Sequence, residues 1–181
     1  MSKGIGPVEI SGMKTVLLVR HAKSSWKDPG LKDFDRPLNK RGKRDAPFMG
    51  KALKERRIHP DLILSSPAKR ARQTARVIAE AIGYPKKKIL FDEAIYHAPA
   101  GALLELVRKQ DDANRTIMLF GHNPGFNDLA DILLKDGTAR KMPTTGVYCI
   151  RFGVARWREV EEGTGALDFF DHPRRYETEA T

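Results

Sequence analysis

The stretch Thr15-Val16-Leu17-Leu18-Val19-Arg20-His21-Ala22 decides the fold. Its first five residues are apolar or β-branched, a composition that is typical of a buried strand. Arg20 and His21 follow at once, and a cation and an imidazole at the end of a buried strand lose solvation unless another group compensates. The carboxyl edge of a parallel sheet, where ligands bind, offers such compensation. The stretch therefore predicts a ligand site, with a strand that ends in a solvated basic loop as the alternative.

Length and composition set the first limits. The 181 residues, 40% hydrophobic and 31% charged, fit one globular domain. A net charge of +10 favours acidic partners such as phosphorylated proteins, nucleotides or nucleic acid. Cys149 is the only cysteine, which excludes an internal disulfide and a thiolate metal cluster. No apolar stretch approaches a membrane span, and residues 1–13 lack the apolar core of a secretory signal, so we expect a cytoplasmic protein with no membrane contact.

The chain divides into a loose extension over residues 1–13, in which Met13 is an alternative start, one domain over residues 14–172, and a polar, frayed tail over residues 173–181. Strands alternate with helices through the domain, which predicts an α/β three-layer sandwich with a mainly parallel central sheet. The predicted strands after the first are 61–65, 88–91, 116–120 and 146–152. A predicted hairpin of 156–160 with 167–170 follows them. The predicted helices are 40–57, 67–82, 99–110 and 126–134.

Three details of these helices are predicted as well. Asn39 is the N-cap of the first helix, and Pro47 should bend or interrupt that helix. Ser66 and Pro67 stand in the order of a cap and a first helical residue, so they should begin the second helix.

Polar residues follow three of the predicted strands. Arg20 and His21 follow the first strand, and His122 follows the strand 116–120. The strand 61–65 leads to a helix whose first turns carry Lys69, Arg70 and Arg72. Because the carboxyl ends of parallel strands lie along one edge of a sheet, we expect both imidazoles to meet over one pocket.

Two imidazoles, arginines and a helix N-terminus suit a phosphate group, since arginine presents a planar fork to phosphate oxygens and the helix adds free N–H groups. The sequence has no HExxH pattern, no P-loop, and no acidic residue at these strand ends. We therefore expect phosphate chemistry without a metal or a cofactor, with His21 as the nucleophile and Arg20 holding the phosphoryl group.

Four blocks of residues occur in order along the chain. They are Leu18-Val19-Arg20-His21-Ala22-Lys23-Ser24, Leu38-Asn39-Lys40-Arg41-Gly42, Ser65-Ser66-Pro67-Ala68-Lys69-Arg70-Ala71-Arg72-Gln73-Thr74 and Gly121-His122-Asn123-Pro124-Gly125. Together they resemble the histidine phosphatase superfamily, the branch that includes phosphoglycerate mutases, and within it the small phosphohistidine phosphatases of the SixA type. A fifth block, residues 142–146, also looks like that subgroup. The resemblance covers roughly residues 14–155 and implies a phosphoglycerate mutase-like fold.

The resemblance implies that His21 is phosphorylated during turnover and that Arg20, Arg70 and His122 complete the phosphate pocket. Glu93 is the candidate general acid, with Asp92 behind it, and an exposed structural carboxylate is the alternative. The other candidates have weaker assignments: Lys69 and Arg72 are solvated helix cations, His97 is a pocket candidate, His59 is a surface residue, His172 belongs to the tail, and Cys149 belongs to the core.

The span from Phe91 to Thr116 leaves little room for a large cap domain, so an open, basic pocket is expected. The resemblance then favours phosphohistidine on a protein, such as a His-phosphotransfer domain, as the substrate. A phosphatase of small phosphate esters or pyrophosphates is the first alternative. A binder of phosphoprotein or nucleic acid without catalysis is the second, and it is disfavoured because it gives two histidines at strand ends no role. The sequence carries no signal for an oligomeric state.

Overall fold

Strand β1 (Lys14–Arg20) lies inside a mixed sheet with the strand order β3-β2-β4-β1-β5-β6. The computed structural model of the chain describes residues 12–137 and 139–177, so residues 1–11 of the predicted extension and 178–181 of the predicted tail lie outside it. The other strands in that range are β2 (Leu62–Ser65), β3 (Leu90–Phe91), β4 (Thr116–Gly121), β5 (Val147–Phe152) and β6 (Ala166–Asp171).

The strands that carry the candidate residues run in one direction. β1 and β2 both pair in parallel with β4, and β3 pairs in parallel with β2. Arg20 lies opposite Gly121, and Ser65 lies opposite Phe120, so the three strands end at the same level of the sheet. β5 is antiparallel to β1, and β6 is antiparallel to β5, which makes this side of the sheet mixed.

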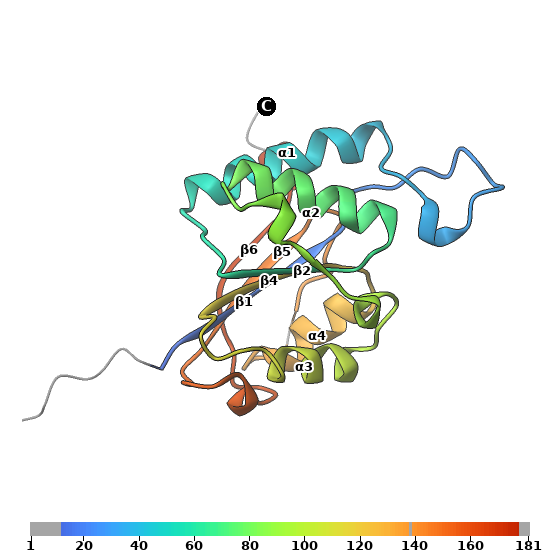
Figure 1. The fold of residues 1–181 in the computed structure, drawn as a ribbon. Helices are drawn as coiled ribbons and strands as arrows, with labels where there is room; N and C mark the ends of the chain where they lie inside the picture. Colours follow the sequence, from blue (N-terminus) through green and yellow to red (C-terminus); the bar gives the residue numbers. More distant parts are fainter. Residues whose placement is uncertain (1–11, 138, 178–181) are drawn as a thin grey trace, which may run out of the picture.

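Two pairs of helices cover the two faces of the sheet, as Figure 1 shows. Helices α1 (Lys40–Glu55) and α2 (Lys69–Ala81) lie on one face, and α3 (Ala100–Arg108) and α4 (Gly125–Leu133) lie on the other. Alternate residues of β1 enter the two cores: Leu17 packs with Met49 of α1, whereas Leu18 packs with Phe126 of α4. The α/β three-layer prediction is confirmed, and no large cap domain is inserted between β3 and β4.

Asn39 caps helix α1, as predicted: its side chain accepts a hydrogen bond of 2.9 Å from the Gly42 N–H. Gly42 is needed here because the backbone of Lys23 occupies the space that a Cβ atom would take. The helix continues through the exposed Pro47 without interruption.

Helix α2 begins at Lys69 after Ala68, so the prediction that Ser66 and Pro67 start it is wrong. The hydroxyl of Ser66 bonds to His122 instead of capping the helix from an N-cap position. The third predicted strand is also shorter than expected, because residues Lys86–Lys88 form the 3-10 helix η2 and only Leu90–Phe91 pair.

The predicted hairpin of 156–160 with 167–170 is wrong. Residues Trp157–Glu159 form the 3-10 helix η4, and β6 pairs with β5. The chain after β6 does not fray at once, since residues Arg174–Glu177 form the short helix α5. The Tyr176 ring of this helix contacts the Phe48 ring of α1, with centroids 5.1 Å apart. Within the described residues, none of the helices combines the length and the apolar character that a membrane crossing requires.

Candidate active site

The three strand ends meet at one cavity of about 300 Å³. Arg20 and His21 reach it from the end of β1, His122 from the end of β4, and Arg70 from the first turn of α2. The ring centroids of His21 and His122 are 5.2 Å apart. The structure thus brings together the four residues that the sequence placed in one pocket.

His21 is a buried imidazole at the cavity, and the hydrogen bonds of its two ring nitrogens fix its tautomer. Its Nδ1 lies 2.7 Å from the Ala22 carbonyl oxygen, and because a carbonyl only accepts, Nδ1 carries the proton. Nε2 therefore accepts, and it receives a hydrogen bond of 3.3 Å from Arg70 Nε. Burial lowers the pKa of His21 to about 3, with a further contribution from the Arg70 charge. The ring is a neutral imidazole whose Nε2 carries no proton, which is the state that a nucleophile needs.

His122 is neutral as well, with the opposite tautomer. Its Nδ1 accepts a hydrogen bond of 3.2 Å from Arg70 Nη2, and its Nε2–H donates to the Ser66 hydroxyl at 2.7 Å. Burial, together with smaller contributions from the neighbouring His21 and Arg70, lowers the pKa of His122 to about 2. A neutral ring beside a buried guanidinium avoids a second positive charge in the same small volume.

Arg70 holds the two rings in place. Its side chain is 3% exposed, and its three nitrogens are all engaged. Nε contacts His21, Nη2 contacts His122, and Nη1 donates to the backbone oxygen of Asp33 at 2.7 Å. A planar donor fork of this kind fits phosphoryl oxygens as well as it fits carboxylates.

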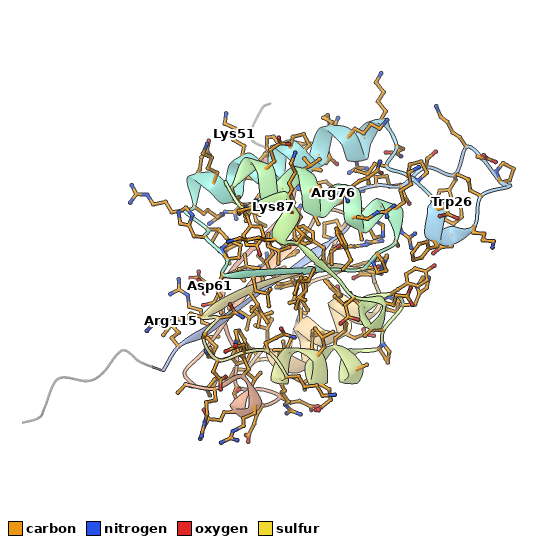
Figure 2. All side chains as sticks on the ribbon, in the orientation of Figure 1. Trp26, Lys51, Asp61, Arg76, Lys87 and Arg115 are labelled. Atoms are coloured by element: carbon orange, nitrogen blue, oxygen red, sulfur yellow. The ribbon has the colours of Figure 1, made fainter. Side chains whose placement is uncertain are left out.

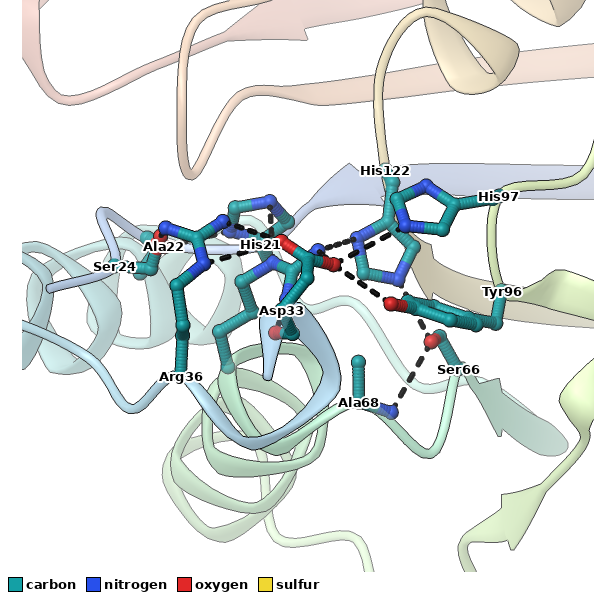
Figure 3. Close-up of polar contacts among 11 residues, drawn as sticks. His21, Ala22, Ser24, Asp33, Arg36, Ser66, Ala68, Tyr96, His97 and His122 are labelled. Carbon is teal, nitrogen blue, oxygen red and sulfur yellow. Dashed lines mark hydrogen bonds and ion pairs between the residues drawn. The ribbon is translucent and has the colours of Figure 1, made fainter. Parts of the chain in front are cut away.

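Asp33 is the site residue that sequence reasoning missed. It begins the 3-10 helix η1 (Asp33–Asp35), and Figure 3 shows its carboxylate between Arg36 on one side and Tyr96 and His97 on the other. Its Oδ2 accepts hydrogen bonds from Arg70 at 3.0 Å and from the Tyr96 hydroxyl at 2.7 Å, and it lies 3.1 Å from His97 Nε2. Its other oxygen, Oδ1, accepts from Arg36 Nε at 3.1 Å.

The Asp33 carboxyl is ionised. Burial alone would raise its pKa, but the hydrogen bonds from Tyr96, Arg36 and Arg70 outweigh burial and hold the pKa well below its usual range. The site therefore already contains an anion at the point where its donors converge. No spacing pattern in the sequence marks this residue, because it follows no strand and lies in a polar loop.

Glu93 does not line this cavity. It lies exposed on the 3-10 helix η3 (Glu93–Ile95), and Asp92 caps that helix by accepting from the Ala94 N–H at 2.8 Å. His97, four residues after Glu93, does line the cavity. The structure thus replaces Glu93 with Asp33 as the carboxylate at the site, and it supports the weaker prediction for His97.

Arg20 forms the wall of the cavity rather than its centre. Its Nη1 donates to the Met142 carbonyl oxygen at 2.9 Å, and its buried Nε has no hydrogen-bond partner among the described residues. Lys69 and Arg72, which the sequence placed on the helix surface, do not line the cavity. His59 is exposed and Cys149 is buried, as predicted, and burial raises the pKa of that thiol to about 12.

The residue types offer little to a metal ion. Among residues 12–137 and 139–177, no three His, Cys, Asp or Glu side chains are grouped so that they could hold one. The donors of this site are guanidinium, imidazole and hydroxyl groups around one carboxylate, an arrangement that binds an anion.

Comparisons with known proteins show the family of the chain. Residues 16–110 match the model of the histidine phosphatase superfamily (branch 1). An uncharacterised protein of Mycobacterium tuberculosis is 35% identical over 165 residues, which cover 86% of this chain and 100% of that protein. A 2,3-bisphosphoglycerate-dependent phosphoglycerate mutase of a Chelativorans species is 31% identical over 110 residues, but these cover only 56% of this chain and 49% of the mutase.

Solved structures show the same fold. A crystal structure from Agrobacterium tumefaciens, named as a SixA phosphohistidine phosphatase, is 31% identical and superimposes with a TM-score of 0.74. The match covers 88% of this chain and 98% of that chain. A SixA protein histidine phosphatase in complex with tungstate superimposes with a TM-score of 0.77 over 90% of this chain and 99% of the other, and at 18% identity this likeness shows the fold alone.

Proposed function

The chain belongs to the histidine phosphatase superfamily, and from that membership we propose that it is a phosphatase which transfers a phosphoryl group to His21 and then to water. The superfamily includes phosphatases and mutases. A mutase has to enclose its substrate for a second transfer, and this chain carries no inserted cap domain over the site.

One observation carries the proposal: His21 is a buried, neutral imidazole whose Nε2 lone pair faces the guanidinium of Arg70. In the first step Nε2 attacks phosphorus in line, a P–N bond forms, and the bond to the leaving group breaks. In the second step water attacks the same phosphorus, and the P–N bond to His21 breaks. A positioned arginine stabilises the charge on the transferring group in both steps and contributes on the order of 10³ to 10⁵ in rate in other phosphoryl transfers.

The Asp33 carboxylate indicates where the phosphoryl oxygens bind. Arg70 cannot hold two anions at full strength, because like charges at one guanidinium repel each other. The Asp33 side chain is 40% exposed, so it has solvent to move into when a phosphoryl group takes its place at Arg70. His122 and Arg20 then flank the phosphoryl group from the ends of β4 and β1.

We infer protein phosphohistidine as the favoured substrate. Two features support it: the likeness to the SixA phosphatase at 31% identity, and an open, basic site beside the exposed Trp26. Glu93, the predicted proton donor, is not at the cavity, and the depressed pKa of Asp33 makes that carboxyl a poor donor. An imidazole leaving group needs less help than an alkoxide, since it leaves once its free nitrogen is protonated. Small phosphate esters are the alternative substrates.

Trapping of the intermediate tests the proposal. The protein is mixed with a radiolabelled phosphohistidine protein, quenched at alkaline pH, and mapped for an acid-labile phosphoryl group. We expect the label on His21, and no label or turnover in His21→Ala. The exposed His59 supplies the control, since His59→Ala should behave as wild type. Wild-type turnover by His21→Ala contradicts the proposal.

A further inference from the structure

A second cavity of about 450 Å³ lies beside the reaction pocket. Arg20, Lys23 and Thr144 line both cavities, so the two are neighbours that share one wall. Arg41, Lys141 and Arg174 line the second cavity only, and among the described residues no carboxylate lines it. The second cavity is thus a concave, positively charged surface next to the nucleophile.

The cations of the second cavity come from four separate segments of the chain. Gly42 lets the first turn of α1 lie directly on the backbone of Lys23, and the Asn39 N–H donates to the Lys23 carbonyl oxygen at 2.9 Å. Arg41 and Lys23 are therefore brought to the same cavity. Helix α5 adds Arg174, and the loop before β5 adds Lys141.

Hydrogen bonds hold the loop that carries Lys141. The Met142 N–H donates to Asn127 Oδ1 at 2.6 Å, and the Met142 carbonyl oxygen accepts from Arg20 at 2.9 Å and from Asn123 Nδ2 at 3.0 Å. The wall between the cavities is therefore fixed by contacts to β1 and α4.

Most of these charges are not neutralised within the protein. Arg41 pairs with the buried Asp45 at 3.2 Å. Lys23, Lys141 and Arg174 have no carboxylate partner in the part of the chain that the structure describes, and Arg20 keeps its buried Nε without a hydrogen bond there. Unpaired cations in a concave surface raise the local concentration of anions.

We propose that the second cavity is an anion subsite, which binds a second phosphate or carboxylate group of the substrate while the transferred phosphoryl group lies at His21. The inference rests on the proposed phosphatase function and narrows its substrate class to phosphoryl compounds with a second anionic group within reach. That group is either the second phosphate of a small bisphosphate or an acidic side chain next to a phosphohistidine.

Two substrate series test the subsite and separate these sources. The first compares butyl phosphate with alkanediol bisphosphates of increasing spacer length. The second compares phosphohistidine peptides that carry Asp or Ala at successive neighbouring positions. We expect wild type to prefer one spacer length or one Asp position by about tenfold in kcat/KM, as expected for one charge-assisted contact. A preference in the first series identifies the second anionic group as the phosphate of a small bisphosphate, and a preference in the second series identifies it as an acidic side chain next to a phosphohistidine.

The variant Lys141→Ala/Arg174→Ala removes two cations that lie outside the reaction pocket. We expect it to lose the preference and to keep its kcat/KM within about twofold on butyl phosphate and on the Ala peptides, which lack a second anionic group. Lys51→Ala/Lys87→Ala is the matched control: it removes the same charge from exposed positions that Figure 2 shows away from Trp26 and the site. This control should keep the preference.

The outcomes are distinct. The subsite proposal is contradicted if Lys141→Ala/Arg174→Ala shows the same preference in kcat/KM as wild type. It is also contradicted if wild type shows no preference in either substrate series. If no substrate is hydrolysed at all, the proposed function fails, and calorimetry with the same alkanediol bisphosphates decides the subsite alone. Tighter binding of a bisphosphate than of butyl phosphate, lost in Lys141→Ala/Arg174→Ala and kept in the control, supports it. Equal binding of both ligands overturns it.

Discussion

The two buried histidines should make the folded protein sensitive to mild acid. The pKa of His21 falls to about 3 and that of His122 to about 2 in the folded state, from 6.5 in an exposed ring. Below pH 6.5 the unfolded chain therefore binds more protons than the folded chain. Stability is lost as the pH falls from 6.5 toward these lower values.

The size of the loss follows from the linkage relation. Between pH 6.5 and pH 4.5 an unfolded histidine passes from half protonated to almost fully protonated, whereas His21 and His122 stay neutral in the fold. Each ring then costs about 2 kcal/mol of stability over this interval, and the two rings together cost roughly twice as much. Asp33 contributes little in this range, because its stabilising effect is lost only below the pKa of an exposed aspartate, 3.8.

Urea unfolding at pH 6.5 and pH 4.5, followed by the fluorescence of the buried Trp157, measures the loss. His122→Asn retains a donor and an acceptor for Ser66 and Arg70, so it should lose about 2 kcal/mol less than wild type over the same interval. His59→Asn changes an exposed ring and should match wild type. Identical losses for wild type and His122→Asn would refute the argument, because His122 would then be protonated in the fold.

Three further substitutions test the roles of Asp33 and Glu93 and the close contact at Gly42. Asp33→Asn removes the anion that occupies Arg70, so the inhibition constant of inorganic phosphate should fall roughly tenfold. An unchanged inhibition constant together with a lower kcat would indicate that Asp33 is a proton donor instead. Glu93→Gln should leave kcat/KM within about twofold on phosphoserine-type esters and on phosphohistidine, whereas a loss confined to the esters would restore Glu93 as the acid. Gly42→Ala forces a Cβ onto the Lys23 backbone and should lower the free energy of unfolding by about 1–3 kcal/mol. In the same urea titration Gly101→Ala, in open space on α3, should raise it by about 0.5–1 kcal/mol, and equal effects of the two changes would contradict the close contact.

The sequence predicted the sheet and the two histidines because both depend on local signals. An apolar, β-branched run that ends in a polar residue predicts a buried strand with a ligand edge, and β1 and β4 both follow this pattern. Arg70 was predictable from the family motif, since it lies in the first turn of the helix that follows β2.

Asp33 depends on contacts between distant segments. Arg36 orders its loop by donating to Ser24 Oγ at 2.9 Å and by lying 3.6 Å from the centre of the Trp26 ring. Arg70 and Tyr96 then reach the Asp33 carboxylate from 37 and 63 residues away. No local pattern in the sequence predicts such contacts. The sequence therefore pointed to Glu93, which lies close in the chain to Tyr96 and His97 of the site but is itself exposed to solvent.

The two wrong local predictions have similar causes. The Ser66 hydroxyl contacts His122, which is 56 residues away, and it also accepts from the Ala68 N–H at 3.3 Å, which lies before the first turn of α2 and not inside it. Residues 156–160 look like a strand, but the Trp157 N–H donates to Asp112 Oδ1 at 2.7 Å, and Arg156 pairs with Glu159 at 2.6 Å. These contacts favour the tight turn η4 over an extended segment.

The placement of Asp33 has a consequence for selectivity among dissolved anions. A carboxylate tethered to the same chain competes at Arg70 with an effective concentration of the order of millimolar or higher. Chloride, acetate and other monoanions would have to displace it without offering a stronger charge. A doubly charged phosphoryl group offers that charge, so we expect the tethered Asp33 side chain to exclude common weak anions from Arg70 and to admit phosphorylated compounds to His21.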